Sequence, residues 1–241
     1  MFDLIAMEIK KLKGASIMWL SLLGAFAAPF LNFMLYMYRK SNGHQALFLD
    51  MVDQVNMFIL LLIGLMLYSL VTAYCFSREY EEDTLKSVLT IPVGRTSLII
   101  SKTIVVVLWI LFLTLFAFVF CVIFSLIGGF EGNTGENFLA AFKLFFKSAL
   151  LMIPLMTPII FVTLLFKKYI PGMVLSIGIA VCNLMIMNSK YALIFPWTVP
   201  ITIIKSPNAR EYDISLSWIS LLATGIIFMI LSIVYFRKKD V

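Results

Sequence analysis

Charged residues are scarce in this sequence. Asp, Glu, Lys and Arg make up 13% of the 241 residues, whereas hydrophobic residues make up 62%. Soluble domains carry about 25% charged and about 45–50% apolar residues. The interior of one globule of this size is too small to hold the excess apolar surface, so a soluble enzyme domain is excluded. The composition predicts an all-α, polytopic membrane protein.

Residues for metal and nucleotide chemistry are also few. Histidine occurs once, at His44, and the sequence contains neither HExxH nor GxxxxGK[ST]. A zinc hydrolase would therefore lack its ligands, and an ATPase would lack its phosphate-binding loop. The three cysteines lie in separate apolar runs without a CxxC pair, which is typical of small buried hydrophobes. We predict no catalytic residue, no metal site and no cofactor held by this chain itself.

Long uncharged runs dominate what is present. A helix needs about 20 residues to cross the roughly 30 Å of hydrocarbon in a bilayer, and its backbone must satisfy its own hydrogen bonds there. Six runs are long enough, and together they form a single transmembrane domain over 1–241. The predicted spans are 15–38, 54–77, 99–128, 146–166, 170–189 and 214–236. Pro154 and Pro158 predict a kink in the fourth span.

The basic residues predict the orientation. Six spans place both termini on one side of the membrane, and that side carries twelve of the 19 Lys and Arg residues. By the positive-inside rule these twelve, and both termini, are expected on the cytoplasmic side of the membrane. The net charge of +6 is then explained by topology and by contact with lipid headgroups, and it predicts no nucleic-acid partner.

The first thirteen residues predict an amphipathic helix. Phe2, Ile5, Ile9 and Leu12 recur at helical spacing, whereas Asp3 and the lysines lie elsewhere on the wheel. Such a helix would lie in the headgroup layer. A short extension of the first span is the alternative interpretation.

The charged stretch that follows the second span predicts a short surface helix over 79–90. Arg78 and Glu82, and then Glu82 and Lys86, are spaced i,i+4, and Leu85 begins an apolar face. Without other information, a solvated loop helix is the simpler interpretation. The order of the residues, however, follows a recognisable pattern: an acidic cluster, a Thr-Leu pair, a Leu-x-x-Pro, a basic residue and a lysine that opens the third span. The residues in question are Glu79, Glu81, Glu82, Thr84, Leu85, Leu89, Pro92, Arg95 and Lys102.

This pattern resembles the signature region of ABC type-2 permeases, the membrane subunits of ATP-binding-cassette exporters. The resemblance covers essentially the whole chain. It implies that the 79–90 segment is a cytoplasmic coupling helix that contacts a separate ATPase subunit, and that ATP and Mg²⁺ are bound by that partner. It also implies a second permease chain, identical or related. The residues expected to contact the ATPase are Glu79, Glu81, Glu82, Thr84, Leu85 and Arg95.

The uncharged segment 191–204 is too short and too rich in proline to span the membrane. A broken extracellular segment at this place matches the family, and Pro196, Trp197 and Pro200 are similar to the branch that includes bacitracin-resistance and lantibiotic-immunity permeases. That branch implies an amphipathic or lipophilic cargo such as a peptide antibiotic. Asp50 and Asp53 are expected outside, where they would meet a cationic peptide.

Polar residues inside the spans have two interpretations. Interhelical hydrogen bonds are one, and the lining of a transport cavity is the other. The candidate cavity residues are Asn56, Ser69, Thr72, Thr157 and Asn183. The uncharged runs, which in the third and fourth spans begin after Lys102 and Lys147, hold no ionisable side chain of the kind that ion coupling normally needs, which disfavours an ion-coupled secondary transporter. That class, and a non-transporting sensory or structural subunit, remain the alternatives.

Overall fold

The computed structural model describes residues 2–12, 14–84, 94–205 and 214–238. Within these ranges the chain is helical throughout, and its only β-type pairing is an isolated bridge between Leu47 and Glu131. The all-α prediction is confirmed. The elements are α1 (Phe2–Leu12), α2 (Ser16–Ser41), α3 (Phe48–Leu61), α4 (Ile63–Glu81), α6 (Arg95–Gly128), α7 (Gly135–Met152), η1 (Pro154–Met156), α8 (Thr157–Phe166), α9 (Tyr169–Ile186), η2 (Lys190–Leu193), α10 (Val199–Lys205) and α11 (Ile214–Lys238).

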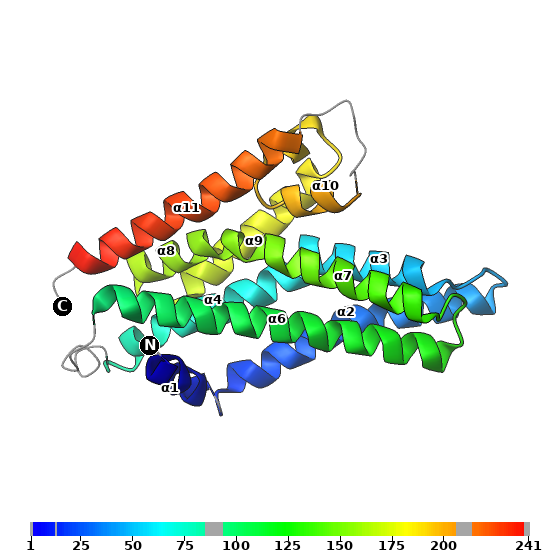
Figure 1. Cartoon of the computed structure of the whole chain (residues 1–241), viewed down its shortest axis with the longest axis horizontal. Helices are drawn as coiled ribbons and strands as arrows, with labels where there is room; N and C mark the ends of the chain where they lie inside the picture. The colour runs from blue at the N-terminus through cyan, green and yellow to red at the C-terminus, as the bar shows by residue number, and fades with distance from the viewer. Residues whose placement is uncertain (1, 13, 85–93, 206–213, 239–241) are drawn as a thin grey trace.

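Among the described residues, five helical segments are long and apolar enough to cross a membrane, and a sixth span results when the bent pair α3–α4 is counted as one. These segments correspond to the six predicted spans. The long helices run along the longest axis of the molecule (Figure 1). The start of α1 and the end of α11 lie at one end, which we call the proximal end. The turns between α2 and α3 and between α6 and α7, together with α10, lie at the other, the distal end.

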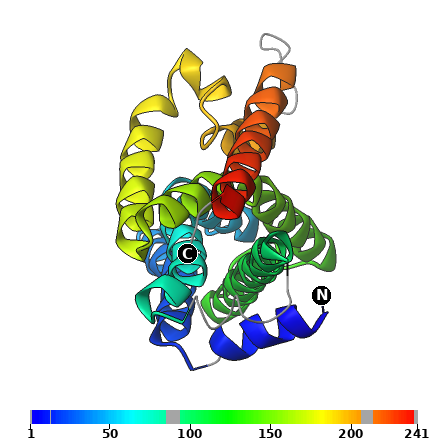
Figure 2. The ribbon, with the colours of Figure 1, turned by 90° about the vertical axis from the view of Figure 1, so that its left-hand side faces the viewer.

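The core is built around α6, the longest helix. It packs against α2 through a cluster of phenylalanines, in which the ring centroids of Phe26 and Phe120 are 4.9 Å apart and those of Phe33 and Phe124 are 5.0 Å apart. Viewed from the proximal end, α1 lies along one side of this bundle, whereas α9 and α11 rise on the other (Figure 2).

The second span is bent by 44° between α3 and α4. Leu62 takes φ −132° and ψ −80° at the break. Gly64 allows the bend, because a Cβ there would lie 2.5 Å from the carbonyl oxygen of Ile59. The helix pair also begins at Phe48, not at residue 54 as predicted. The prediction began the span just after Asp53, but a charged side chain near a membrane surface does not prevent a helix from starting before it.

The fourth span is interrupted where the prolines predict. A 3₁₀ turn at η1 separates α7 from α8, beginning at Pro154, whose ring cannot donate the helical hydrogen bond. Gly225 of α11 packs against this turn, since a Cβ at that position would lie 2.8 Å from the Cβ of Pro154. The helix begins at Gly135, earlier than the predicted residue 146, because Thr134 caps it by accepting from the backbone N–H of Asn137.

The short helices at the N-terminus and before the last span are present where they were predicted. η2 and α10 form a broken segment between α9 and α11, as predicted for 191–204. The N-terminal helix α1 is present, but its packed side differs from the predicted one. Ile9 is 47% exposed, whereas Glu8 and Leu12 are buried against the bundle. Its position relative to lipid headgroups stays a prediction.

Candidate functional site

The proximal end contains a buried cluster of charges centred on Lys102. The ammonium nitrogen of this residue lies 2.9 Å from Glu8 Oε2, 2.5 Å from Glu79 Oε1 and 2.9 Å from the backbone oxygen of Cys75. All three of its protons therefore have an acceptor. Residues from α1, α4 and α6 meet here, and the side chains of Glu8, Glu79 and Lys102 are each at most 10% exposed.

A second lysine closes the cluster on its solvent side. Lys11 Nζ lies 2.8 Å from Glu8 Oε1 and 3.1 Å from Glu79 Oε1. Partial burial alone would lower the pKa of Lys11, but the hydrogen bond to Glu8 and the charge of Glu79 outweigh it and raise the pKa above its ordinary value. Arg78 donates to the backbone oxygen of Lys11. The cluster thus fastens α1 to α4 and α6 with two carboxylates and two ammonium groups, which balance in charge.

Glu79 was expected on a surface helix, where it would contact an ATPase subunit, and the structure places it in the interior instead. Its side chain is 4% exposed and is held by Lys102 and Lys11, so it has no surface to offer a partner. It belongs to the last turn of α4, not to a separate surface helix. The prediction failed because a carboxylate in an acidic run was assumed to be solvated, although two lysines far away in sequence pair with it.

The two acids that follow have different surroundings. Glu81 Oε1 accepts from the backbone N–H of Tyr169 at 3.0 Å, so this carboxylate satisfies an N–H at the start of α9. Both acids are exposed. The Glu82 side chain is 48% exposed and pairs with Arg78 at 2.8 Å, as the i,i+4 spacing predicts. Glu81 therefore joins two spans, whereas Glu82 faces outward.

The remaining residues of the predicted contact lie around the connection between α4 and α6. Thr84 follows a turn in which Asp83 has φ 51°, and its N–H bonds to the backbone oxygen of Glu79. Arg95 opens α6 and donates to the backbone oxygen of Arg237 at 3.2 Å, which links it to the end of α11. Leu85 lies outside the described residues, as does 85–90 of the predicted coupling helix. That helix stays a prediction for 85–90, whereas its first residues belong to α4.

The sequence reasoning missed the roles of Glu8 and Lys102. Lys102 was noted only as the residue that opens the third span, and Glu8 was not connected to it. A signal was present: Glu8 shares one helical face with Ile5 and Leu12, at i+3 and i+7, where an apolar residue would be expected. A carboxylate on the apolar face of one helix and a lysine inside another predict a buried pair, although the sequence does not say which of several acids the lysine meets.

Two of the five candidate cavity residues line cavities. Thr157 lies at a cavity of about 370 Å³ between α6, α8 and α11, whose accessible lining is wholly apolar. The Thr157 hydroxyl bonds to the backbone oxygens of Pro154 and Gly225, so it presents no free polar group. Asn56 lies at a second cavity of about 410 Å³ near the distal end, between α3, α7 and α10.

The other three candidates lie between helices. Thr72 donates to the backbone oxygen of Tyr68 on its own helix, and Ser69 is fully buried beside it. Asn183 of α9 donates to the backbone oxygen of Leu61 at 3.4 Å, at the break between α3 and α4. The Asn183 contact is of the interhelical kind, whereas the Thr72 bond stays within α4.

The broken segment at the distal end is held against α11. Ser217 and Ser220 of α11 donate to the backbone oxygens of Leu193 and Ile194. Within the segment, the Phe195 and Trp197 rings lie 5.8 Å apart. Of the predicted residues, Pro200 is buried at the start of α10, whereas Pro196 and Trp197 are half-buried in the turn before it.

Comparison with known proteins fits this arrangement. Residues 4–183 match the family described as ABC-2 family transporter protein. The chain is also 42% identical over 194 residues to the bacitracin transport permease protein BCRB of Bacillus licheniformis, an alignment that covers 80% of this chain and 93% of that protein. The family match includes the helices that form the proximal cluster, and the helices described above are those of a multi-pass membrane protein. The chain therefore belongs to the ABC-2 transporter family and is a membrane-spanning permease subunit of an ABC transporter.

Proposed function

We propose that this chain is the permease subunit of an ABC exporter that clears an amphipathic compound, such as a peptide antibiotic, from a bacterial plasma membrane. The observation that carries the proposal is the 42% identity to a bacitracin transport permease along 93% of that protein's length. The energy comes from a separate ATPase subunit, which binds ATP and Mg²⁺. Two permease chains, identical or related, complete the transporter.

The distribution of basic residues supports an orientation with both termini in the cytoplasm. At the proximal end, α1 and α11 finish in basic residues, and Lys167 and Lys168 lie at the turn between α8 and α9. The positive-inside rule assigns such an end to the cytoplasm. The connection between α4 and α6 then faces the ATPase subunit.

The contact with the ATPase is proposed to use Glu82, Thr84 and Leu85, with Glu81 and Arg95 beside them. Glu82 and Thr84 are exposed, so they are available to a partner. Behind them, Glu81 reaches α9 and Arg95 reaches α11. A push on this connection would therefore reach α4, α9 and α11 at once, which is a physical basis for transmission without any catalytic group.

The test is purification of the tagged chain in mild detergent from its native host, with identification of the bound proteins and an ATPase assay. We expect an ATPase subunit to co-purify, and its recovery to fall at least fivefold with the double variant Glu82→Ala and Leu85→Ala. Glu136→Gln, an acidic residue at the distal end, is the matched control and should leave recovery unchanged. A folded chain that brings down no ATPase would contradict the proposal and favour a secondary transporter or a sensory subunit.

A further inference from the structure

The distal cavity beside Asn56 differs from the apolar cavity beside Thr157 in its chemistry. Its volume is about 410 Å³, within the roughly 300–1,000 Å³ typical of ligand sites. Asp53, Asn56 and Lys205 supply a polar side, and Leu60, Leu144 and Ile201 supply an apolar side. An apolar wall with a few convergent polar groups is the usual composition of a small-molecule site.

Asn56 is the first sign of a missing partner. The residue is 3% exposed, and its side-chain oxygen Oδ1 accepts no hydrogen bond from any described residue. Buried side-chain oxygens in native proteins are nearly always paired. Asn56 is also among the residues that line the cavity, so a rotation of its amide group would bring Oδ1, which is closed to solvent here, to a donor in the cavity.

The two charges in the cavity attract each other but make no direct ion pair: Lys205 lies close enough to stabilise the Asp53 carboxylate electrostatically. Asp53 and Lys205 both line it, yet the ion pairs among the described residues do not include one between them. Lys205 Nζ instead lies 3.1 Å from the sulfur of Met57, which is a weak acceptor. A carboxylate and an ammonium group that share a cavity without pairing are complementary to a molecule that carries an amine and a carboxylate of its own.

We infer that this cavity is a binding subsite for one end of an amphipathic peptide that carries both an amino group and a carboxylate. The amino group faces Asp53 and the Asn56 oxygen, the carboxylate faces Lys205, and an apolar side chain lies on Leu60, Leu144 and Ile201. A cavity of this volume holds a few residues of a peptide antibiotic, not the whole molecule. The inference rests on the proposed function for its biological role, because it places a cargo subsite at the outer face of the permease.

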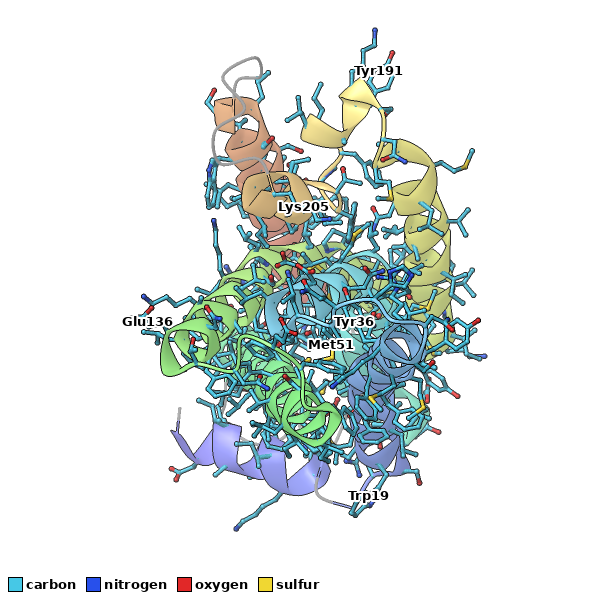
Figure 3. All side chains as sticks on the ribbon, turned by 90° about the vertical axis from the view of Figure 1, so that its right-hand side faces the viewer. Trp19, Tyr36, Met51, Glu136, Tyr191 and Lys205 are labelled. Atoms are coloured by element: carbon cyan, nitrogen blue, oxygen red, sulfur yellow. The ribbon has the colours of Figure 1, made fainter. Side chains whose placement is uncertain are left out.

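The geometry of the distal end provides the controls. Figure 3 views the molecule from this end and shows Lys205 on α10, well separated from Glu136 at the start of α7. Glu136 and Lys190 carry the same charges as Asp53 and Lys205 but are not among the residues that line the cavity. Glu136→Gln and Lys190→Met are therefore matched to Asp53→Asn and Lys205→Met.

The experiment measures bacitracin binding to the purified permease in nanodiscs of phosphatidylglycerol, without any ATPase subunit, by microscale thermophoresis. We expect the dissociation constant to rise at least tenfold with Asp53→Asn, Lys205→Met or Asn56→Leu, and less than twofold with the two controls. Asn56→Leu also tests folding, because it removes a polar atom that has no partner and should leave the thermal midpoint unchanged or raised.

Three results would overturn the inference: no binding by the wild-type chain, equal weakening by the controls, or unchanged affinity in all three cavity variants. A second arm replaces half of the lipid by phosphatidylethanolamine, whose headgroup also joins an amine to an anionic group. One outcome of that arm is that the wild-type chain loses bacitracin binding when phosphatidylethanolamine is present, while the affinity of Asp53→Asn is the same in both lipids. That pair of results would assign the cavity to a lipid headgroup and overturn the peptide assignment. Because no ATPase is present, binding that persists while co-purification of an ATPase fails would reject the proposed function and leave the subsite standing.

Discussion

Lys102 at the proximal end and Asn56 at the distal end are both buried polar residues, but their surroundings are opposite. Each ammonium proton of Lys102 has an acceptor, and the two carboxylates around it are shared with Lys11. The oxygen of Asn56 has no partner in the described part of the chain, and Asp53 and Lys205 beside it attract each other without a direct ion pair.

The proximal end has buried charges that are fully paired, whereas the distal end has buried polar groups that are not. The six buried side-chain atoms without a partner among the described residues include Asn56 Oδ1 and Trp197 Nε1 in the distal half, but also Ser77 Oγ near the proximal cluster. A saturated ion cluster resists rearrangement, because every change of position breaks a charged hydrogen bond. Unpaired groups lower stability, and a ligand that pairs with them gains affinity. The proximal end thus suits the transmission of force, and the distal end suits recognition.

The largest expected effect comes from breaking the proximal cluster. Lys102→Met leaves the Glu8 and Glu79 carboxylates buried beside each other with only Lys11 as partner. Removing one member of a buried ion pair costs about 3–5 kcal/mol. We expect the thermal midpoint of the detergent-purified chain to fall sharply, or the protein to aggregate, as read by fluorescence-detected size-exclusion chromatography.

The control for this variant is Lys143→Met, since Lys143 is exposed on α7. It should shift the unfolding free energy by less than about 0.5 kcal/mol. Adding Glu8→Gln and Glu79→Gln to Lys102→Met should recover part of the loss, because the uncompensated charges disappear. A Lys102→Met chain as stable as the wild type would show that the cluster does not hold the helices together.

The bend of the second span connects the two ends and gives the next largest effect. In Gly64→Ala the new Cβ would lie 2.5 Å from the carbonyl oxygen of Ile59, so the backbone must move. Overpacking of this kind costs about 1–3 kcal/mol. Gly178→Ala on α9 is the matched control, because a Cβ there meets no atom within 4 Å. The thermal midpoint should fall for Gly64→Ala and stay the same or rise for Gly178→Ala. Equal midpoints would mean that the backbone at the bend moves to accept the new Cβ without loss of stability.

Replacing Asn183 or Asn56 by leucine should change the thermal stability by a smaller amount, and the two replacements should differ. Asn183→Leu removes the hydrogen bond to the backbone oxygen of Leu61, and such bonds in membranes are worth about 0.6 kcal/mol on average. Asn56→Leu removes no side-chain hydrogen bond given for the described residues. We therefore expect a small loss of stability for Asn183→Leu and none for Asn56→Leu, in parallel thermal scans. The reverse order would show that Asn56 has a structural partner and would weaken the case for a subsite.

Much of the fold could be predicted because it depends on local composition. Uncharged runs gave the six spans, and Pro154 gave the interruption of the fourth. The ends were less accurate, since the runs stop at charges such as Asp53 and Lys147 whereas the helices continue to their caps, as at Thr134. The bend at Leu62 was missed because it depends on the close approach of Gly64 to the preceding turn, which no run length reveals.

The candidate site was predicted in part for a related reason. The i,i+4 pair of Arg78 and Glu82 is local and was correctly anticipated. The pairing of Lys102 with Glu8 joins residues 94 positions apart, and the contact of Glu81 with Tyr169 joins residues 88 apart. Such contacts follow from how the spans assemble, and a single sequence does not state them. Glu79 was assigned to the surface because the sequence does not reveal its pairing with Lys102 and Lys11.

The smallest expected effect on stability belongs to Glu82, and it separates the two roles of the proximal end. Glu82 pairs with Arg78 at the surface, and exposed i,i+4 pairs contribute about 0.3–0.5 kcal/mol. Glu82→Gln should therefore leave the thermal midpoint nearly unchanged while lowering the recovery of the ATPase subunit severalfold. Glu79→Gln should do the opposite: it should destabilise the chain, and the fraction that stays folded should still bind the ATPase, because Glu79 lies inside the cluster and touches no partner. If both variants lost the ATPase equally at equal stability, the buried cluster and the exposed contact would be one site, and the division of the proximal end into a rigid core and a docking surface would be wrong.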